Sequence, residues 1–207
     1  MLCAAARRSP GAWTTVAARA LALILVVDAV VFATDPVIKH TWTARASLPL
    51  SLCDVALVIA AAACWWPHRP LLIELTWFWG LTGTFQAVAT PDLTVGFPHL
   101  EFFEYVVGHL GIVIAALYLV VGLGYRPRAR AVPRVFAITV VYTGFVGVMD
   151  AALNADYMFL ASPPVHWSLL SVLGPWPWYI LSAAALALVL LFVLDAPFRA
   201  GRRTASA

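Results

Sequence analysis

The residues of this chain best suited to chemistry are polar groups placed inside long apolar stretches. An ionisable side chain at the centre of a membrane helix costs about 2.5 to 3.5 kcal/mol on insertion scales, so its presence needs a reason. For Asp54, His109 and Asp150 we favour function, whereas interhelical hydrogen bonding explains Gln86 and Asn154 equally well and a simple ion pair is preferred for Glu74. These residues are Asp28, Asp54, Glu74, Gln86, Glu104, His109, Asp150 and Asn154.

Cys53 and His109 are the candidate catalytic pair. A cysteine nucleophile needs a neighbouring base because the thiolate is the reactive form, and His109 is the only histidine inside a predicted span. Asp54, Asp150 or Asn154 would orient the imidazole, and Gln86 or Asn154 would stabilise an oxyanion. The alternative is that Cys53 only fills space, which is the commoner role of a buried cysteine.

Other chemistries have weaker support. The remaining histidines fall in loops or at helix borders, so paired haem ligands are not predicted. A metal held by His109, Asp54 and Asp150 has no spacing signature, and no hydrolase or phosphate-loop motif occurs. We therefore predict neither a metal nor a cofactor.

The composition places these groups in a membrane protein. Hydrophobic residues make up 63% of the 207 residues and charged residues 11%, against about 25% charged in soluble domains. The net charge of +3 comes from short basic groups beside apolar runs, which set orientation and do not indicate nucleic-acid binding. Membrane lipids or an amphiphilic substrate are the expected partners.

Six apolar segments predict an all-α transmembrane bundle of about six spans, forming a single domain over residues 1–207. A span needs roughly 20 residues, and proline suits the first turn of a helix because it lacks an amide donor. Pro49, Pro70, Pro133 and Pro175 each lie near a start. The predicted spans cover residues 16–33, 48–66, 71–89, 102–122, 134–153 and 176–194.

The basic residues predict the orientation. With the N-terminus in the cytoplasm, eleven of the thirteen Lys and Arg fall on the cytoplasmic side and two on the other, so both termini are predicted to be cytoplasmic. We expect a bacterial plasma membrane. The first segment, which follows Arg7, Arg8 and Arg19, is read as an uncleaved span, with a cleaved signal peptide as the alternative.

This topology predicts an outward-facing polar pocket. At about 1.5 Å per residue, polar groups of four helices lie roughly 6 to 10 Å below their outer ends. Glu74 alone lies in the inner half, where we expect it to pair with a base such as Arg69. Gly80, Gly83, Gly108 and Gly111 would let the third and fourth spans approach closely. The residues predicted to bind substrate are Asp54, Gln86, Glu104, Tyr105, Asp150, Asn154 and Trp176.

Several motifs resemble the YwaF-like integral membrane family, also known as the TP0381 type. They are LPLSLCDVA at residues 48–56, FWGLTGTFQAVATPDL at 78–93, FFEYVVGHLGIVIAALYL at 102–119 and DYMFLASPPVHWSLLSVLGPWPWYI at 156–180. The chain departs from the family pattern at Ser51, Asp150, Asp156 and Ser171. These polar-for-polar changes keep a wet pocket but alter its hydrogen bonds.

The resemblance implies a possible activity. Distant eukaryotic relatives resemble cysteine-dependent acyltransferases that move fatty acyl chains between phospholipids, with the nucleophile and the histidine at the motif positions of Cys53 and His109. We therefore expect a lipid acyltransferase or acyl hydrolase. The alternative is a non-catalytic protein that uses the same pocket for lipid or small-molecule binding, transport or membrane assembly.

Overall fold

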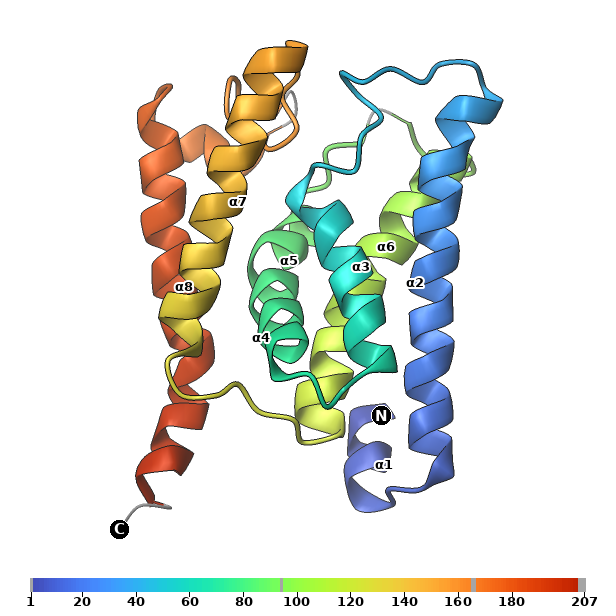
Figure 1. Cartoon of the computed structure of the whole chain (residues 1–207), viewed down its shortest axis with the longest axis vertical. Helices are drawn as coiled ribbons and strands as arrows, with labels where there is room; N and C mark the ends of the chain where they lie inside the picture. The colour runs from blue at the N-terminus through green and yellow to red at the C-terminus, as the bar shows by residue number, and fades with distance from the viewer. Residues whose placement is uncertain (1, 94, 165–166, 205–207) are drawn as a thin grey trace.

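The structure is a computed structural model that describes residues 2–93, 95–164 and 167–204, and within these residues it contains helices and no strands. Figure 1 shows the helices as an upright bundle. The α-helices are α1 (Leu2–Arg8), α2 (Ala12–Ile38), α3 (Leu52–Trp65), α4 (Pro70–Trp79), α5 (Phe85–Ala89), α6 (Leu100–Leu117), α7 (Ala131–Leu153) and α8 (Trp178–Thr204). Two π-helical turns, η1 (Gly80–Thr84) and η2 (Tyr118–Gly122), continue α4 and α6, and a 3₁₀ turn, η3 (Leu169–Val172), precedes α8.

Each predicted span coincides with a helix. Four helices of the described chain are long and apolar enough to cross a membrane: Ala12–Ile38, Leu100–Gly122, Ala131–Leu153 and Trp178–Ala200. α3 is a shorter apolar helix, and the series α4–η1–α5 runs without a break from residue 70 to 89. The all-α prediction is confirmed, while the number of helices that cross the membrane stays a prediction.

The core of the bundle is formed by α2, α3, α4 and α6, and small residues allow their close packing. Ala56, Ala60 and Ala63 of α3 are fully buried, as are Ala115 and Ala116 of α6. Where side chains are this small, helix backbones approach closely and gain van der Waals contact, which drives helix association in lipid. The residues that face outward are mostly large aliphatic ones, as lipid contact requires.

The predicted glycine contact between the third and fourth spans is correct for one glycine only. A Cβ on Gly80 would meet the Ala116 Cβ and the Ile112 Cγ2 of α6 at 3.3 Å each. Gly108 and Gly111 instead face α2, where a Cβ would lie 2.6 Å from Asp28 Oδ2 and 2.6 Å from Leu25 Cδ2 respectively. α6 therefore uses its glycines to approach α2.

α7 and α8 form a pair at one side of the bundle (Figure 1). Two side-chain hydrogen bonds attach α7 to the core besides the Glu74 ion pair described below: the Trp79 indole donates to Thr139 Oγ1 at 2.8 Å, and the Tyr142 hydroxyl donates to the Leu50 carbonyl at 2.8 Å. α8 contacts the core through Phe198, whose ring packs edge-on against Trp77 with centroids 5.7 Å apart. The pair is thus joined to the core by a few specific contacts.

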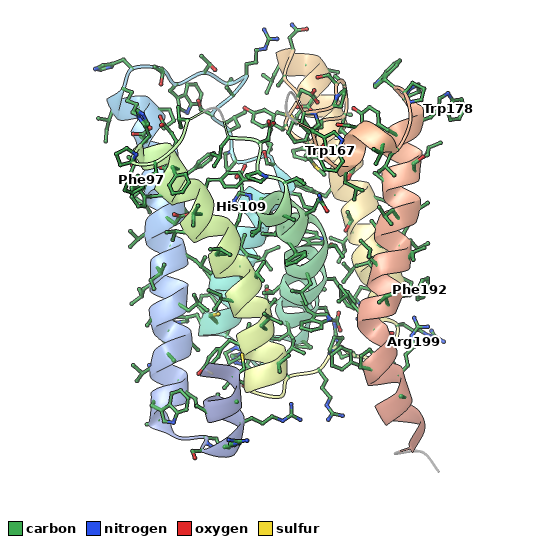
Figure 2. All side chains as sticks on the ribbon, turned by 180° about the vertical axis from the view of Figure 1, so that it is seen from behind. Phe97, His109, Trp167, Trp178, Phe192 and Arg199 are labelled. Carbon is green, nitrogen blue, oxygen red and sulfur yellow. The ribbon has the colours of Figure 1, made fainter. Side chains whose placement is uncertain are left out.

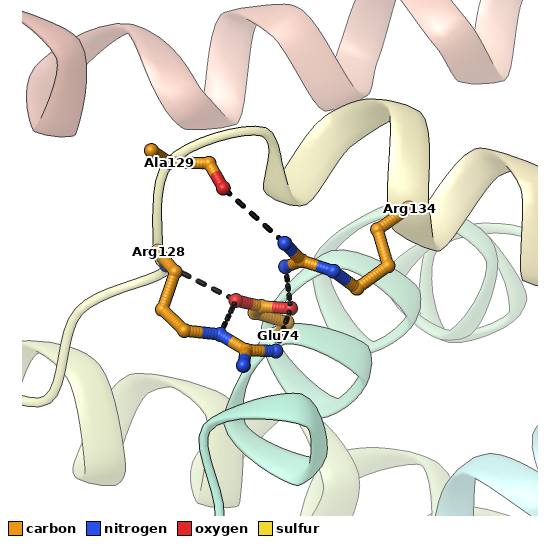
Figure 3. A network of polar contacts seen from close by, with 4 residues as sticks. All are labelled: Glu74, Arg128, Ala129 and Arg134. Atoms are coloured by element: carbon orange, nitrogen blue, oxygen red, sulfur yellow. Dashed lines mark hydrogen bonds and ion pairs between the residues drawn. The ribbon is translucent and has the colours of Figure 1, made fainter.

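Glu74 is the most heavily paired acid of the bundle (Figure 3). Its side chain is fully buried, and its carboxylate accepts from Arg128 N, Nε and Nη2 at 3.1, 2.8 and 3.2 Å and from Arg134 Nη1 at 2.7 Å. Hydrogen bonding to Glu74 raises the pKa of Arg128 above its ordinary value. Pairing was predicted correctly, but the partners come from the segment before α7 and from α7, not from Arg69. These bonds join α4 to α7.

The two ends of the bundle differ in composition. Both termini lie at one end, together with the α3–α4 connection and the loop between η2 and α7, which carries Arg128 of the Glu74 network (Figure 1). The opposite end carries aromatic residues, among them Phe97, Trp167 and Trp178 (Figure 2). Tryptophan is enriched at headgroup level and arginine on the cytoplasmic side, so this arrangement fits the predicted orientation.

Candidate functional site

The site begins at the first turn of α3, which the sequence starts with a capping box. Ser51 is the N-cap; its side chain accepts from the Asp54 backbone, and Asp54 Oδ2 accepts from the Ser51 amide at 3.1 Å. Such reciprocal bonds satisfy amides that a helix N-terminus otherwise leaves free. The predicted span 48–66 is therefore wrong at its start, because the capping box begins the helix at Leu52. Cys53 becomes its second residue.

Cys53 lies where three elements meet. Its side chain is half-buried, and the Thr84 hydroxyl donates to Cys53 Sγ at 3.9 Å. Thr84 is buried at the end of η1, and Gly83 in the same turn packs against Leu52, where a Cβ would lie 3.5 Å from Cδ2. Single π-helical turns occur frequently at functional sites. Here the π turn directs Thr84 at the sulfur.

His109 and Tyr105 form a stacked pair on α6. The ring centroids are 4.0 Å apart with an interplanar angle of 27°. His109 Nδ1 lies 2.7 Å from the Tyr105 carbonyl oxygen. A carbonyl only accepts, so Nδ1 carries the proton in the neutral ring, and Nε2 keeps a lone pair. Nε2 is therefore the ring nitrogen that can accept a proton. Figure 2 places His109 in the half of the bundle that also carries Phe97.

Tyr105 joins α6 to α5, since its hydroxyl donates to the Ala87 carbonyl at 2.8 Å. Among the described residues, no hydrogen bond joins Cys53 to His109: the sulfur accepts from Thr84, and the imidazole donates to the Tyr105 backbone. The structure thus shows no direct bond between the two residues of the predicted pair.

Asp150 lies near the end of α7 and is bonded to the loop that follows it. Its side chain is 5% exposed; Oδ1 accepts from the Tyr157 amide at 3.1 Å, whereas Oδ2 is buried with no hydrogen-bond partner in the described residues. A buried acceptor without a donor is destabilising, and in native proteins it often marks a ligand or water position. Among the predicted site residues, Asp150 is therefore the clearest candidate to bind a ligand or a water molecule, through Oδ2.

Tyr157 ties the loop after α7 to the start of α3. Its hydroxyl donates to the Ala44 carbonyl at 2.8 Å and accepts from the Leu48 amide at 3.0 Å, while its carbonyl accepts from Ser51 Oγ at 3.0 Å. Sequence reasoning did not select Tyr157 or Thr84. The capping box could have been found from the S-x-x-D spacing alone, but a loop tyrosine carries no local signal of this kind.

The remaining predicted substrate-binding residues lie apart from the cysteine or have partners of their own. Gln86 donates to Thr90 Oγ1 at 2.8 Å within the same turn of chain. Asn154 is exposed and ends α7 in the left-handed conformation, φ 51°, which asparagine tolerates. Trp176 is 61% exposed, and its indole donates to the Leu160 carbonyl. Glu104 lines a separate groove, between α6 and α2, together with Asp28.

No group of three or more His, Cys, Asp or Glu side chains among residues 2–93, 95–164 and 167–204 is arranged to hold a metal ion. The three cysteines are all free thiols. The side chains available for chemistry are the half-buried Cys53 thiol, the His109 imidazole with one free nitrogen, and the carboxyl groups of Asp54 at the start of α3 and Asp150 at the end of α7.

A known protein family matches most of the chain. The sequence model of the TMEM164 family, which comprises multi-pass membrane proteins, matches residues 1–195. Every candidate site residue falls within this match. No curated protein and no solved structure shows significant similarity to the chain.

Proposed function

The chain belongs to the TMEM164 family of multi-pass membrane proteins, and we propose that it transfers or hydrolyses the acyl group of a membrane lipid with Cys53 as nucleophile and His109 as general base. The resemblance of its motifs to the YwaF-like family supports this proposal, because distant eukaryotic relatives of that family resemble cysteine-dependent acyltransferases. We place the protein in the cell membrane with both termini in the cytoplasm, as its basic residues predict.

The observation that carries this proposal is the position of Cys53 at the first turn of α3, inside the bundle. The N-terminus of a helix carries partial positive charge and free amides, which favour negative charge nearby. The Leu52 and Cys53 amides thus become donors for an oxyanion that forms at the sulfur. Gln86 and Asn154, which the sequence suggested for this role, already serve as a partner of Thr90 and as a helix cap.

In the proposed reaction His109 Nε2 takes the proton of the Cys53 thiol, directly or through one water, and Sγ attacks the carbonyl carbon of the lipid ester. The tetrahedral intermediate collapses with cleavage of the ester C–O bond. The departing alkoxide takes the proton from the imidazolium, and a thioester remains on Cys53. An acceptor hydroxyl or a water then gives its proton to Nε2 and attacks the thioester, which releases the acyl product and returns the thiol.

Thr84 and Tyr105 would hold the reacting groups. The Thr84 hydroxyl donates to the sulfur and would steady the thiolate by a hydrogen bond, while Tyr105 fixes the tautomer and the plane of the imidazole through its carbonyl and its ring. Both act through the nucleophile or the base and are positioning residues.

The test uses the full chain in nanodiscs that contain a phospholipid with an alkyne-tagged acyl chain. We expect a protein adduct that neutral hydroxylamine releases, since this reagent cleaves thioesters, and that maps to Cys53. The adduct should disappear in Cys53→Ala and fall at least tenfold in His109→Ala. Cys64→Ala is the matched control, because Cys64 is a buried thiol of the same helix, and it should keep the adduct.

The second candidate function is non-catalytic binding, transport or membrane assembly, and the Thr84 bond to the sulfur favours it, since a hydrogen-bonded packing thiol needs no base. Under that reading no hydroxylamine-labile adduct forms, while Cys53→Ala still retains lipid through purification. Such a result would reject the acyl-enzyme proposal.

A further inference from the structure

A second hollow lies between α2 and α6, where two carboxyl groups line an otherwise apolar groove. The groove has a volume of about 390 Å³ and is lined by Asp28 and Glu104 together with aliphatic and aromatic side chains. It uses the stripe of α6 that contains Glu104 and Gly108, whereas the site at Cys53 uses the neighbouring stripe with Tyr105 and His109. Nothing in the proposed acyl chemistry requires this groove.

Asp28 is the unusual residue of the groove. It lies well inside α2, its side chain is 9% exposed, and no hydrogen-bond donor among the described residues reaches it. Gly108 makes room for it: a Cβ there would lie 2.6 Å from Asp28 Oδ2. A carboxyl group held in this position, without a donor, is expensive in a membrane and is expected to serve a ligand.

Glu104 lies close enough to Asp28 for the two carboxyl groups to interact electrostatically. Its Oε1 is also buried without a hydrogen-bond partner in the described chain. The lysine at this end of α2, Lys39, is already held by Asp35 at 2.8 Å and by Glu101 at 2.6 Å. The groove thus offers two acceptors with no protein cation bonded to either.

The rest of the lining is hydrocarbon. Val27 is 60% exposed and Phe103 44%, and in a bilayer such outward faces contact lipid chains. Val31 and Val107 extend the apolar wall on either side of the acids. A groove of this size lies at the lower end of the range for small-molecule sites, roughly 300 to 1,000 Å³, and suits one hydrocarbon chain better than a two-chain phospholipid.

We propose that the α2–α6 groove binds a single-chain amphiphile with an ammonium head, the ammonium lying between Asp28 and Glu104 and the chain along the apolar wall. Charge complementarity selects the head, because an ammonium donates to both carboxyl groups in charge-assisted hydrogen bonds and removes the cost of leaving them without donors. An alcohol or an anionic head of equal chain length supplies no such charge.

The experiment couples dodecylamine to the full chain in nanodiscs with a lipid-soluble carbodiimide. The reagent activates a carboxyl group, and an amine bound against it displaces the urea and leaves an amide, whose mass identifies the residue. We expect the amide on Asp28 or Glu104. Dimethyldodecylamine, which is protonated to an ammonium with an N–H donor but cannot form a stable amide, should suppress it at least tenfold by occupying the groove, and dodecanol should not.

Variants complete the test. The double variant Asp28→Asn/Glu104→Gln should lower coupling at this site at least tenfold, and Val27→Trp, which keeps both acids and fills the groove, should do the same if the double variant fails to fold. Glu101→Gln, one turn away on α6 and outside the groove lining, should leave coupling unchanged. Coupling spread evenly over exposed carboxyl groups, equal suppression by dodecanol, or no coupling at either acid would overturn the proposal.

Discussion

Removing both arginine partners of Glu74 should destabilise the bundle more than removing Glu74 itself. Glu74 has no exposed surface, whereas the side chains of Arg128 and Arg134 are 46% and 35% exposed. Without Glu74 the two guanidinium groups can turn toward water and headgroups. Without its arginines the Glu74 carboxylate stays buried and unpaired, and an uncompensated buried charge costs about 3 to 5 kcal/mol of folding stability.

Each single arginine variant should lose less stability than the double variant. Arg134→Ala removes one bond, at 2.7 Å, from a partner that is one-third exposed, so screening limits its effect to about 1 kcal/mol. Arg128→Ala removes two side-chain bonds but keeps the backbone bond at 3.1 Å, and about 2 kcal/mol is expected from charge-assisted bonds partly screened by solvent. In either single variant one arginine still neutralises the carboxylate.

The assay is equilibrium unfolding in mixed detergent micelles. Arg128→Ala/Arg134→Ala should lose about 3 to 5 kcal/mol, and adding Glu74→Gln to that background should restore at least about 2 kcal/mol, because the buried charge is removed. Arg69→Ala/Arg126→Ala, with equal charge loss and no bond to Glu74, should change stability by less than about 0.5 kcal/mol. If the triple variant is no more stable than the double, the reasoning from the buried charge is refuted.

Three further outcomes are expected. Gly108→Ala places a Cβ 2.6 Å from Asp28 Oδ2 of the facing helix and should cost about 1 to 3 kcal/mol of stability by overpacking. In the same unfolding assay the control Gly144→Ala, whose Cβ meets nothing within 4 Å, should be neutral or stabilising. Thr84→Val removes the hydroxyl donor to the Cys53 sulfur, so the rate of Cys53 alkylation by a lipid-soluble maleimide should change several-fold, and an unchanged rate would argue against the contact. Tyr157→Phe loses two hydrogen bonds to the α2–α3 loop and should lower the stability by about 1 to 2 kcal/mol. The protection of that loop from hydrogen exchange should fall with it, and equal protection in the variant would show that other contacts hold the loop.

The helices themselves follow from local sequence. Hydrophobicity over about 20 residues predicts where the long apolar helices lie, and proline marks several starts, because a backbone in lipid must satisfy its hydrogen bonds within the segment. The capping box also lies within four residues, from Ser51 to Asp54, so the start of α3 at Leu52 was available to sequence reasoning although it was predicted at residue 48.

Partners across helices required the tertiary structure. Glu74 was expected beside Arg69, its near neighbour in sequence, but bonds Arg128 and Arg134, 54 and 60 residues away. Glu104 and Tyr105 are adjacent in sequence yet meet different neighbours, the groove beside α2 and the Ala87 carbonyl of α5, because successive residues of a helix point about 100° apart. The rotation of a helix about its own axis decides which stripe meets which neighbour.

The amino-acid sequence by itself determined the membrane class, the places of the helices and the types of side chain available, since these depend on composition and on short-range hydrogen bonding. Packing decided which of those side chains meet: Thr84 at the Cys53 sulfur, Tyr157 across the start of α3, and Asp28 against Gly108. Those contacts depend on how glycines and alanines let particular helix faces approach, a property of the assembled bundle that no single segment contains.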